Sequence, residues 1–210
     1  MGRHQAASPP FALRRVRAVL AGALVLGVGS AATLAAWTDR EYGQATFTTR
    51  RFDTESSVNG GTSWADNTVS PGATFTFDAT AMSPSSVKYA QILIRTKTGS
   101  LAGTLQVAGA SITPAGTDEA TVLGAALRYR VIVSTATCAA GLFTSGAIYV
   151  VGSFAAPVAL GTTGLSTSVT ANGGSNTGLC FEVSLPSNAA NTLQGKTSTA
   201  IWNIVATSVG

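Results

Sequence analysis

The chain has few charged residues for its length. Asp, Glu, Lys and Arg make up 10% of its 210 residues, whereas a typical soluble domain carries about 25%. This scarcity excludes a coiled coil, which needs abundant Glu, Lys and Leu, and a disordered chain kept open by charge repulsion. Hydrophobic residues still make up 45% of the sequence, so a buried core can form. The length favours one domain, or two at most.

The net charge of +4 does not indicate nucleic-acid binding, because it comes from one short segment. Residues 1–36 hold four of the thirteen basic residues and no acidic residue. Residues 37–210 therefore carry nine basic and nine acidic residues and are neutral overall. A surface that binds a phosphate backbone needs a local excess of Lys and Arg, so we expect no nucleic-acid partner.

The N-terminal segment has the order of regions that is typical of a secretory signal peptide. A polar, basic stretch precedes residues 18–36, which are nineteen small or apolar residues without a charge. We interpret residues 1–36 as a signal helix that is removed, and residues 37–210 as a single exported domain. An uncleaved anchor is one alternative, because nineteen residues can just span a bilayer. A twin-arginine signal at Arg14 and Arg15 is another.

The exported part contains no histidine, because the only one, His4, lies in the signal. Without histidine, Ser-His-Asp triads, Cys-His dyads and HExxH zinc sites are excluded. Paired carboxylates could still hydrolyse glycosides or bind calcium, but we interpret the candidate pairs as solvated surface charges. We therefore predict no enzymatic activity, no metal and no cofactor. These pairs are Asp39 with Glu41, Asp53 with Glu55, and Asp118 with Glu119.

The two cysteines, Cys138 and Cys180, both lie in the exported part. An even pair in an oxidising compartment indicates one disulfide. Such a bond closes a loop of about 40 residues and stabilises the fold by roughly 4 kcal/mol. Two free buried thiols are the alternative.

The exported part shows strand periodicity and almost no helical periodicity. Apolar and polar residues alternate over several short runs that are separated by Gly, Pro and Asn turns, which is typical of strands with one buried face. We therefore predict an all-β fold, an antiparallel β-sandwich or jelly roll. The expected strands are 74–78, 87–95, 126–134, 179–185 and 199–207, with shorter ones near 147–154 and 165–170.

Three segments carry a resemblance to a known family. Residues 32–53 (ATLAAWTDREYGQATFTTRRFD) combine a small-residue run, an aromatic, a short acidic stretch and Ala-Thr-Phe. Residues 69–73 form a Pro-Gly turn, and residues 191–208 hold a Gln-Gly-Lys element before a closing strand. The chain resembles the camelysin/TasA group of exported bacterial proteins in these segments. Its cysteine pair and its Ala- and Thr-rich composition resemble a high-GC Gram-positive branch of that group.

The resemblance implies a jelly-roll protein that polymerises into extracellular matrix or cell-surface fibres. It implies removal of the signal by a SipW-type signal peptidase between Ala36 and Trp37, with a cut after Ala32 as the alternative. In such fibres the first strand of one copy completes the sheet of the next. Residues 37–53 then form the donor strand. Its aromatic residues are Trp37, Tyr42, Phe47 and Phe52.

Two other functions remain open at this stage. One is a monomeric secreted binding module or adhesin of the same fold, whose partner is another surface protein or ligand. The other is a metalloprotease, because the resemblance to camelysin implies one, although the exported part has no histidine and would offer a poor set of zinc ligands.

Overall fold

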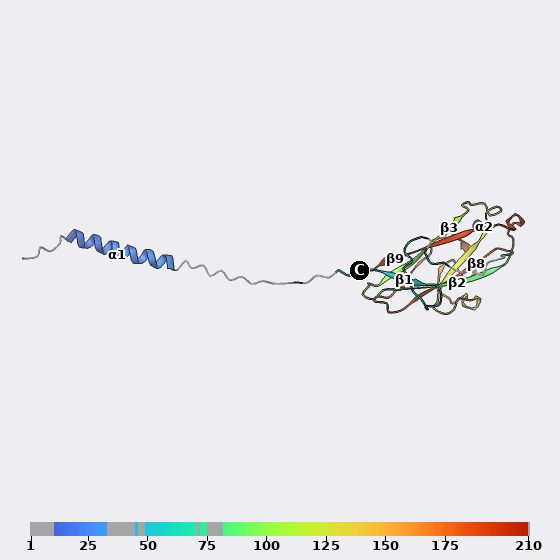
Figure 1. Ribbon diagram of the computed structural model, residues 1–210, viewed down its shortest axis with the longest axis horizontal. Coiled ribbons are helices and arrows are strands. Elements are labelled where there is room, and N and C mark those ends of the chain that lie inside the picture. Colours follow the sequence, from blue (N-terminus) through green and yellow to red (C-terminus); the bar gives the residue numbers. More distant parts are fainter. Residues whose placement is uncertain (1–10, 33–44, 46–48, 71, 75–81, 210) are drawn as a thin grey trace, which may run out of the picture. The chain divides into compact units, whose positions relative to one another are not determined.

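The structure is a computed structural model in which the chain forms two compact units, Met1–Phe47 and Thr48–Gly210. In the first unit, helix α1 runs over Phe11–Ala32 and is drawn in blue in Figure 1. Among the described residues, no helix combines the length and the apolar character needed to cross a membrane. The structure describes residues 11–32, 45, 49–70, 72–74 and 82–209.

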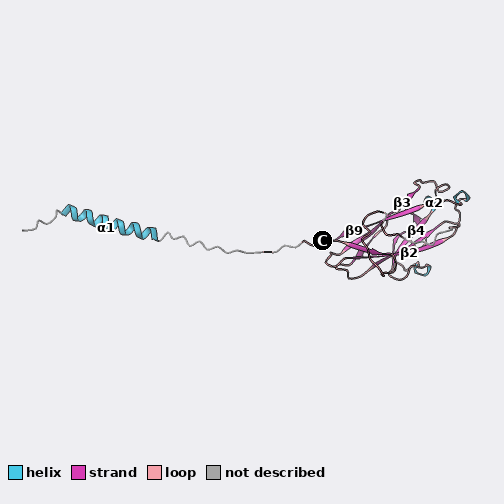
Figure 2. Cartoon of the chain, in the orientation of Figure 1, coloured by secondary structure: helices cyan, strands magenta, loops and turns pink. Residues whose placement is uncertain are grey.

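The second unit consists mainly of strands, as the cartoon in Figure 2 shows. Its described part contains nine strands, one short α-helix and two 3-10 helices. The strands are β1 (Thr54–Ser57), β2 (Val87–Thr96), β3 (Gly103–Thr113), β4 (Arg128–Val133), β5 (Tyr149–Val151), β6 (Val158–Ala159), β7 (Ser166–Val169), β8 (Thr177–Ser184) and β9 (Thr199–Ser208). The helices are α2 (Leu123–Ala126), η1 (Ala140–Leu142) and η2 (Asn191–Leu193).

The strands pair antiparallel in two sheets. The larger sheet has the order β1-β2-β8-β4-β5, and β6 also pairs with β4. The smaller sheet has the order β7-β3-β9. One hydrophobic core contains residues of both sheets, among them Phe181 of β8 and Leu105 of β3. The two sheets therefore pack face to face as a β-sandwich.

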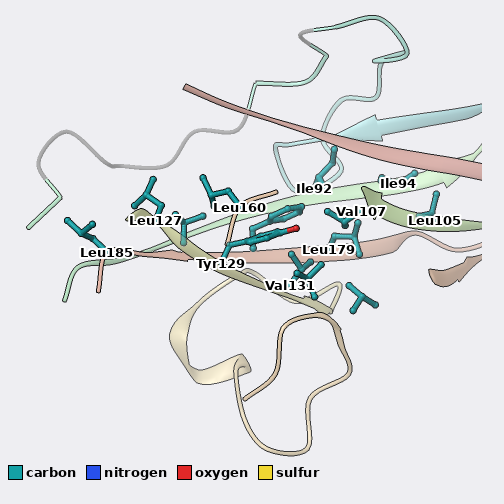
Figure 3. Close-up of a cluster of buried hydrophobic side chains, with 14 of the residues drawn as sticks. Ile92, Ile94, Leu105, Val107, Leu127, Tyr129, Val131, Leu160, Leu179 and Leu185 are labelled. Carbon is teal, nitrogen blue, oxygen red and sulfur yellow. The ribbon is translucent and has the colours of Figure 1, made fainter. Parts of the chain in front are cut away.

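The core is centred on Tyr129 of β4, which is fully buried. Figure 3 shows its ring among the side chains of Val131, Leu160 and Leu179. The ring also lies 6.1 Å from that of Trp202 on β9, measured between centroids. The Tyr129 hydroxyl donates a hydrogen bond to the carbonyl of Thr162, and burial raises the pKa of Tyr129 to about 12. The buried Tyr129 hydroxyl therefore has a hydrogen-bond partner inside the core.

The loop of residues 134–148 packs on the opposite face of the six-stranded sheet. A disulfide joins Cys138 in this loop to Cys180 on β8, with 5.3 Å between their Cα atoms. Phe143 of the same loop packs against Ile132 and Cys180 in a second, smaller hydrophobic cluster. Strand β8 is consequently buried on both faces, which explains why all six of its central residues are buried.

The predicted class is confirmed: the described chain is mostly β, in antiparallel sheets. Four of the expected strands correspond to β2, β4, β8 and β9, and the two shorter ones to β5 and β7. The expected strand at 74–78 lies, apart from Thr74, outside the described residues. The long strand β3, the short strands β1 and β6, and the helices α2, η1 and η2 were not predicted. The jelly-roll connectivity stays a prediction.

Candidate functional site

Strand β9 forms a long, uncharged edge of the smaller sheet. Nine of its ten residues pair with β3 on one side, and nothing among the described residues pairs with its other side. Its side chains alternate between exposed and half-buried from Thr199 to Thr207. Strands β3, β7 and β9 contain no Asp, Glu, Lys or Arg at all. A free edge of this kind can accept hydrogen bonds from, and donate them to, another strand.

A groove runs along β9, between it and the larger sheet. It consists of two adjoining cavities of about 870 and 780 Å³. Ala73, Ile201 and Trp202 line both of them. The groove reaches core side chains of the larger sheet, with Val183 in the first cavity and Ile92 in the second. A strand added to β9 would therefore place alternate side chains on the open side of the core.

The two cavities differ in how their charged residues are paired. The second is lined by Asp53, Glu55 and Asp66, and each of these acids has a basic partner. Arg51 lies 3.4 Å from Asp53, Arg95 lies 2.7 Å from Glu55, and Lys97 lies 2.6 Å from Asp66. The hydrogen bond that the Lys97 ammonium donates to Asp66 is the main cause of the raised pKa of Lys97. This end of the groove is thus close to neutral.

The first cavity holds two lysines and no described acidic residue. Lys88 of β2 and Lys196, in the loop before β9, both line it. Lys88 lies on the same face of β2 as Ala90 and Ile92, which are buried. Its side chain therefore points toward the sandwich interior and is half-buried. Neither lysine forms an ion pair with another described residue.

Residues 51–53 bind to their own domain at one end of the sandwich. The Leu101 amide donates to the Arg51 carbonyl at 3.0 Å, and the Lys97 amide donates to the Asp53 carbonyl at 2.9 Å. The Phe52 ring lies against Gly103, where an added Cβ would come within 2.6 Å of it. The last residues of the predicted donor segment are therefore held in place by their own copy.

A buried ion pair lies on the loop-covered face of the larger sheet. Arg130 of β4 donates two hydrogen bonds, of 2.7 and 2.8 Å, to the carboxylate of its cross-strand neighbour Glu182. Their side chains are 15% and 5% exposed. The hydrogen bond to Glu182 is the main cause of the raised pKa of Arg130, and burial followed by the charge of Glu182 raises the pKa of Tyr89. Phe143 covers the pair, 5.1 Å from the guanidinium.

The carboxylate pairs considered in the sequence do not assemble into one site. Glu119 is bound by Arg128 on β4. The Asp118 carboxylate accepts hydrogen bonds from the Ala120 amide and the Thr121 hydroxyl, which lower its pKa. The described residues contain no group of three or more His, Cys, Asp or Glu side chains that could hold a metal ion.

The predicted cleavage site and most of the donor segment lie outside the described residues. Ala36, Trp37, Tyr42 and Phe47 lie outside the described residues, and so do Asp39 and Glu41 of the first carboxylate pair. Phe52 is described and contacts its own domain. The other predicted pair, Cys138 and Cys180, is joined in the structure.

The groove along β9 and the position of Lys88 in its wall were not predicted from the sequence. A readable signal for Lys88 existed, because in the run VKYAQILIR it shares one face with Ala90, Ile92 and Ile94. A lysine on the apolar face of a strand is unusual unless it has a partner.

In the comparison with known proteins, no protein-family model matches this chain and no curated protein is significantly similar to it.

Proposed function

We propose that this chain is an exported structural protein that assembles into fibres at the cell surface or in an extracellular matrix. The observation that carries the proposal is the edge of β9, which is ten residues long, free of charge and proline, and bordered by a groove whose first cavity is mainly apolar. Natural edge strands are usually protected by lysine, proline or a bulge. The groove offers the two things that strand addition needs, an unpaired backbone and pockets for alternate side chains.

The donor in this proposal is the segment that begins at Trp37, after a SipW-type peptidase removes residues 1–36. Residues 51–53 are bound to their own domain, so the donated strand ends before Arg51. Residues 37–47 span roughly 36 Å as a strand, and the ten residues of β9 span roughly 33 Å. The donated segment is therefore long enough to cover the whole edge, with residues 48–50 as the connection between copies.

The position of residues 51–53 also favours one direction for the proposed assembly. They lie where β2 ends and β3 begins, which is the end where β9 finishes, because Gly103 pairs with Ser208. A neighbour stacked on this end receives the donor at the start of its own β9, so the donated strand runs antiparallel to β9. Each copy then both donates and accepts a strand, and such head-to-tail contacts produce filaments.

Electron microscopy of two chains tests this proposal. One chain begins at Trp37, and the other begins at Thr48, which keeps the compact unit and its bound residues 51–53 intact. We expect filaments from the first chain and dispersed particles from the second. A synthetic peptide of residues 37–50, added to the second chain, should bind at a one-to-one ratio.

A matched pair of substitutions on β9 locates the contact. Ala206→Lys places a charge on the groove side of β9, whereas Thr207→Lys places the same charge on its exposed side. We expect the first variant to stay dispersed and the second to form filaments. Filaments from both variants, or from the chain that begins at Thr48, would contradict strand addition at β9.

A monomeric secreted binding module is the second candidate. It is favoured by the size of the first cavity, about 870 Å³, which lies in the range of small-molecule sites. In that case the chain that begins at Trp37 elutes as a monomer at all concentrations and binds a ligand saturably.

A further inference from the structure

The first cavity of the groove is an apolar space with a positive charge on its wall. Its lining includes core side chains such as Leu127, Val183 and Leu185. Lys88 contributes an ammonium group from the interior-facing side of β2, and Lys196 contributes a second one from the loop before β9. Its larger apolar lining residues include Met82, Leu123, Leu127, Leu185, Leu193 and Trp202.

The charge of this cavity is not balanced by any described residue. The five ion pairs of the described residues involve Arg51, Arg95, Lys97, Arg128 and Arg130, so neither lysine of the cavity takes part. The described lining contains no aspartate or glutamate. A half-buried ammonium next to leucine side chains gains most from an anion that reaches it through the apolar space.

We infer that this cavity binds a fatty acid, with the hydrocarbon chain among the leucine side chains and the carboxylate on Lys88. A neutral hydrocarbon would fill the space but leave the ammonium without a counter-charge, and a cationic amphiphile would meet a charge of the same sign. Lys196, which is exposed, strengthens the attraction at the rim. The fatty acid and a donated strand use the same groove, so each excludes the other.

Binding of dodecanoate to the unit Thr48–Gly210 tests this inference without requiring assembly. This unit has its own core and disulfide. The probes are dodecanoate, dodecanol and dodecyltrimethylammonium, each below its micelle concentration, and calorimetry gives the affinity. We expect dodecanoate to bind at a one-to-one ratio, at least tenfold more tightly than dodecanol, with no saturable binding of the cation.

Two lysine variants assign the carboxylate contact. Lys88→Met keeps an apolar side chain of similar length and should weaken dodecanoate binding at least tenfold while leaving dodecanol binding unchanged. Lys97→Met is the control, because Lys97 lies just after the same strand but is paired with Asp66. It should leave the dodecanoate affinity within twofold of the unchanged protein. Equal urea midpoints for the two variants and the parent exclude unfolding as the cause.

Three results would overturn the inference. The first is dodecanoate binding that is no tighter than dodecanol binding, and the second is unchanged dodecanoate binding by Lys88→Met. The third concerns Asp78, an acidic residue outside the described residues. If dodecanoate does not bind, and Asp78→Asn and Lys88→Met show a coupling energy in a double-mutant cycle, the partner of Lys88 is Asp78 rather than a ligand.

Discussion

The ion pair between Arg130 and Glu182 gives the sharpest test of the energetics of this fold. The change is Glu182→Gln, which keeps the shape of the side chain and removes its charge. Glu182 is 5% exposed and Arg130 is 15% exposed, and the two hydrogen bonds between them are in the strong, bidentate arrangement. After the change, the guanidinium stays under the loop of residues 134–148 without a counter-charge.

Removing one partner of a buried ion pair costs about 3–5 kcal/mol, because the remaining charge is not solvated. Arg130 keeps some contact with water and lies 5.1 Å from the ring of Phe143 and 6.0 Å from that of Tyr149. Aromatic faces stabilise a cation in part, so we expect a loss near the lower limit, about 3 kcal/mol. Small domains have total stabilities of about 5–15 kcal/mol, so this loss is large.

The matched control is Glu119→Gln, the same substitution in another Glu–Arg pair. Glu119 is 61% exposed, and its partner Arg128 is 24% exposed. Exposed pairs contribute about 0–1 kcal/mol, so the control should lose less than 1 kcal/mol. Comparing the two variants separates the effect of burial from the effect of the substitution itself.

Urea denaturation of the unit Thr48–Gly210, followed by tryptophan fluorescence, measures both losses. The double variant Arg130→Met with Glu182→Leu should recover most of the stability, because well-packed apolar residues can replace a buried ion pair. Losses of equal size in Glu182→Gln and Glu119→Gln would refute the reasoning. So would a double variant that is less stable than Glu182→Gln alone.

Three further predictions concern stability. Replacing Cys138 and Cys180 by alanine should lower the free energy of unfolding by about 4 kcal/mol in urea denaturation, because their loop spans 42 residues. Burial raises the pKa of Tyr129 to about 12, so the stabilisation by its neutral form is complete below pH 10 and is lost as the pH rises toward 12. Between pH 9 and 12, the free energy of unfolding measured by urea denaturation should therefore fall less for Tyr129→Phe than for the unchanged protein, with a difference of up to about 2 kcal/mol. Gly103→Ala should cost about 2 kcal/mol in thermal unfolding, because its Cβ would meet the Thr207 carbonyl and the Phe52 ring.

The alternation of apolar residues located the strands that have one or both faces in the core. The run 87–95 corresponds to β2, which ends one residue later, and 199–207 corresponds to β9, which also ends one residue later. Segment 179–185 lies within two residues of β8 at both ends. These strands are readable because their buried positions are filled by residues such as Ile92, Phe181 and Trp202.

Strand β3 escaped prediction because its alternation is interrupted. Leu105 and Val107 follow the pattern, but Ala108, Gly109 and Ala110 break it. The register with β9 shifts between Val107 and Ala110, and Gly109 has a φ of +88°, which glycine adopts without strain. A bulge of this kind re-aims the strand, and the pairing that it permits is visible only once the partner strand is known.

The site could be predicted only in part, because most of it comes from the tertiary structure. The cavity joins Lys88 on β2 to Lys196 before β9, more than 100 residues away in the sequence. No local pattern predicts that these segments face each other. Two signals were present in the sequence: Lys88 alternates in step with the apolar residues of its strand, and the segment of β9 contains no charged residue.

The scarcity of charged residues is most pronounced in the smaller sheet, whose strands β3, β7 and β9 contain none. Among the described edge strands, β1 is four residues long, and its Glu55 forms an ion pair with Arg95 of β2. Strands β5 and β7 are only three and four residues long. Short or charged edges resist pairing with other chains. Strand β9 is the one described edge that is both long and uncharged. Self-repulsion is therefore absent at the edge that borders the groove, which favours this edge over the others as the place where copies would join in the proposed assembly.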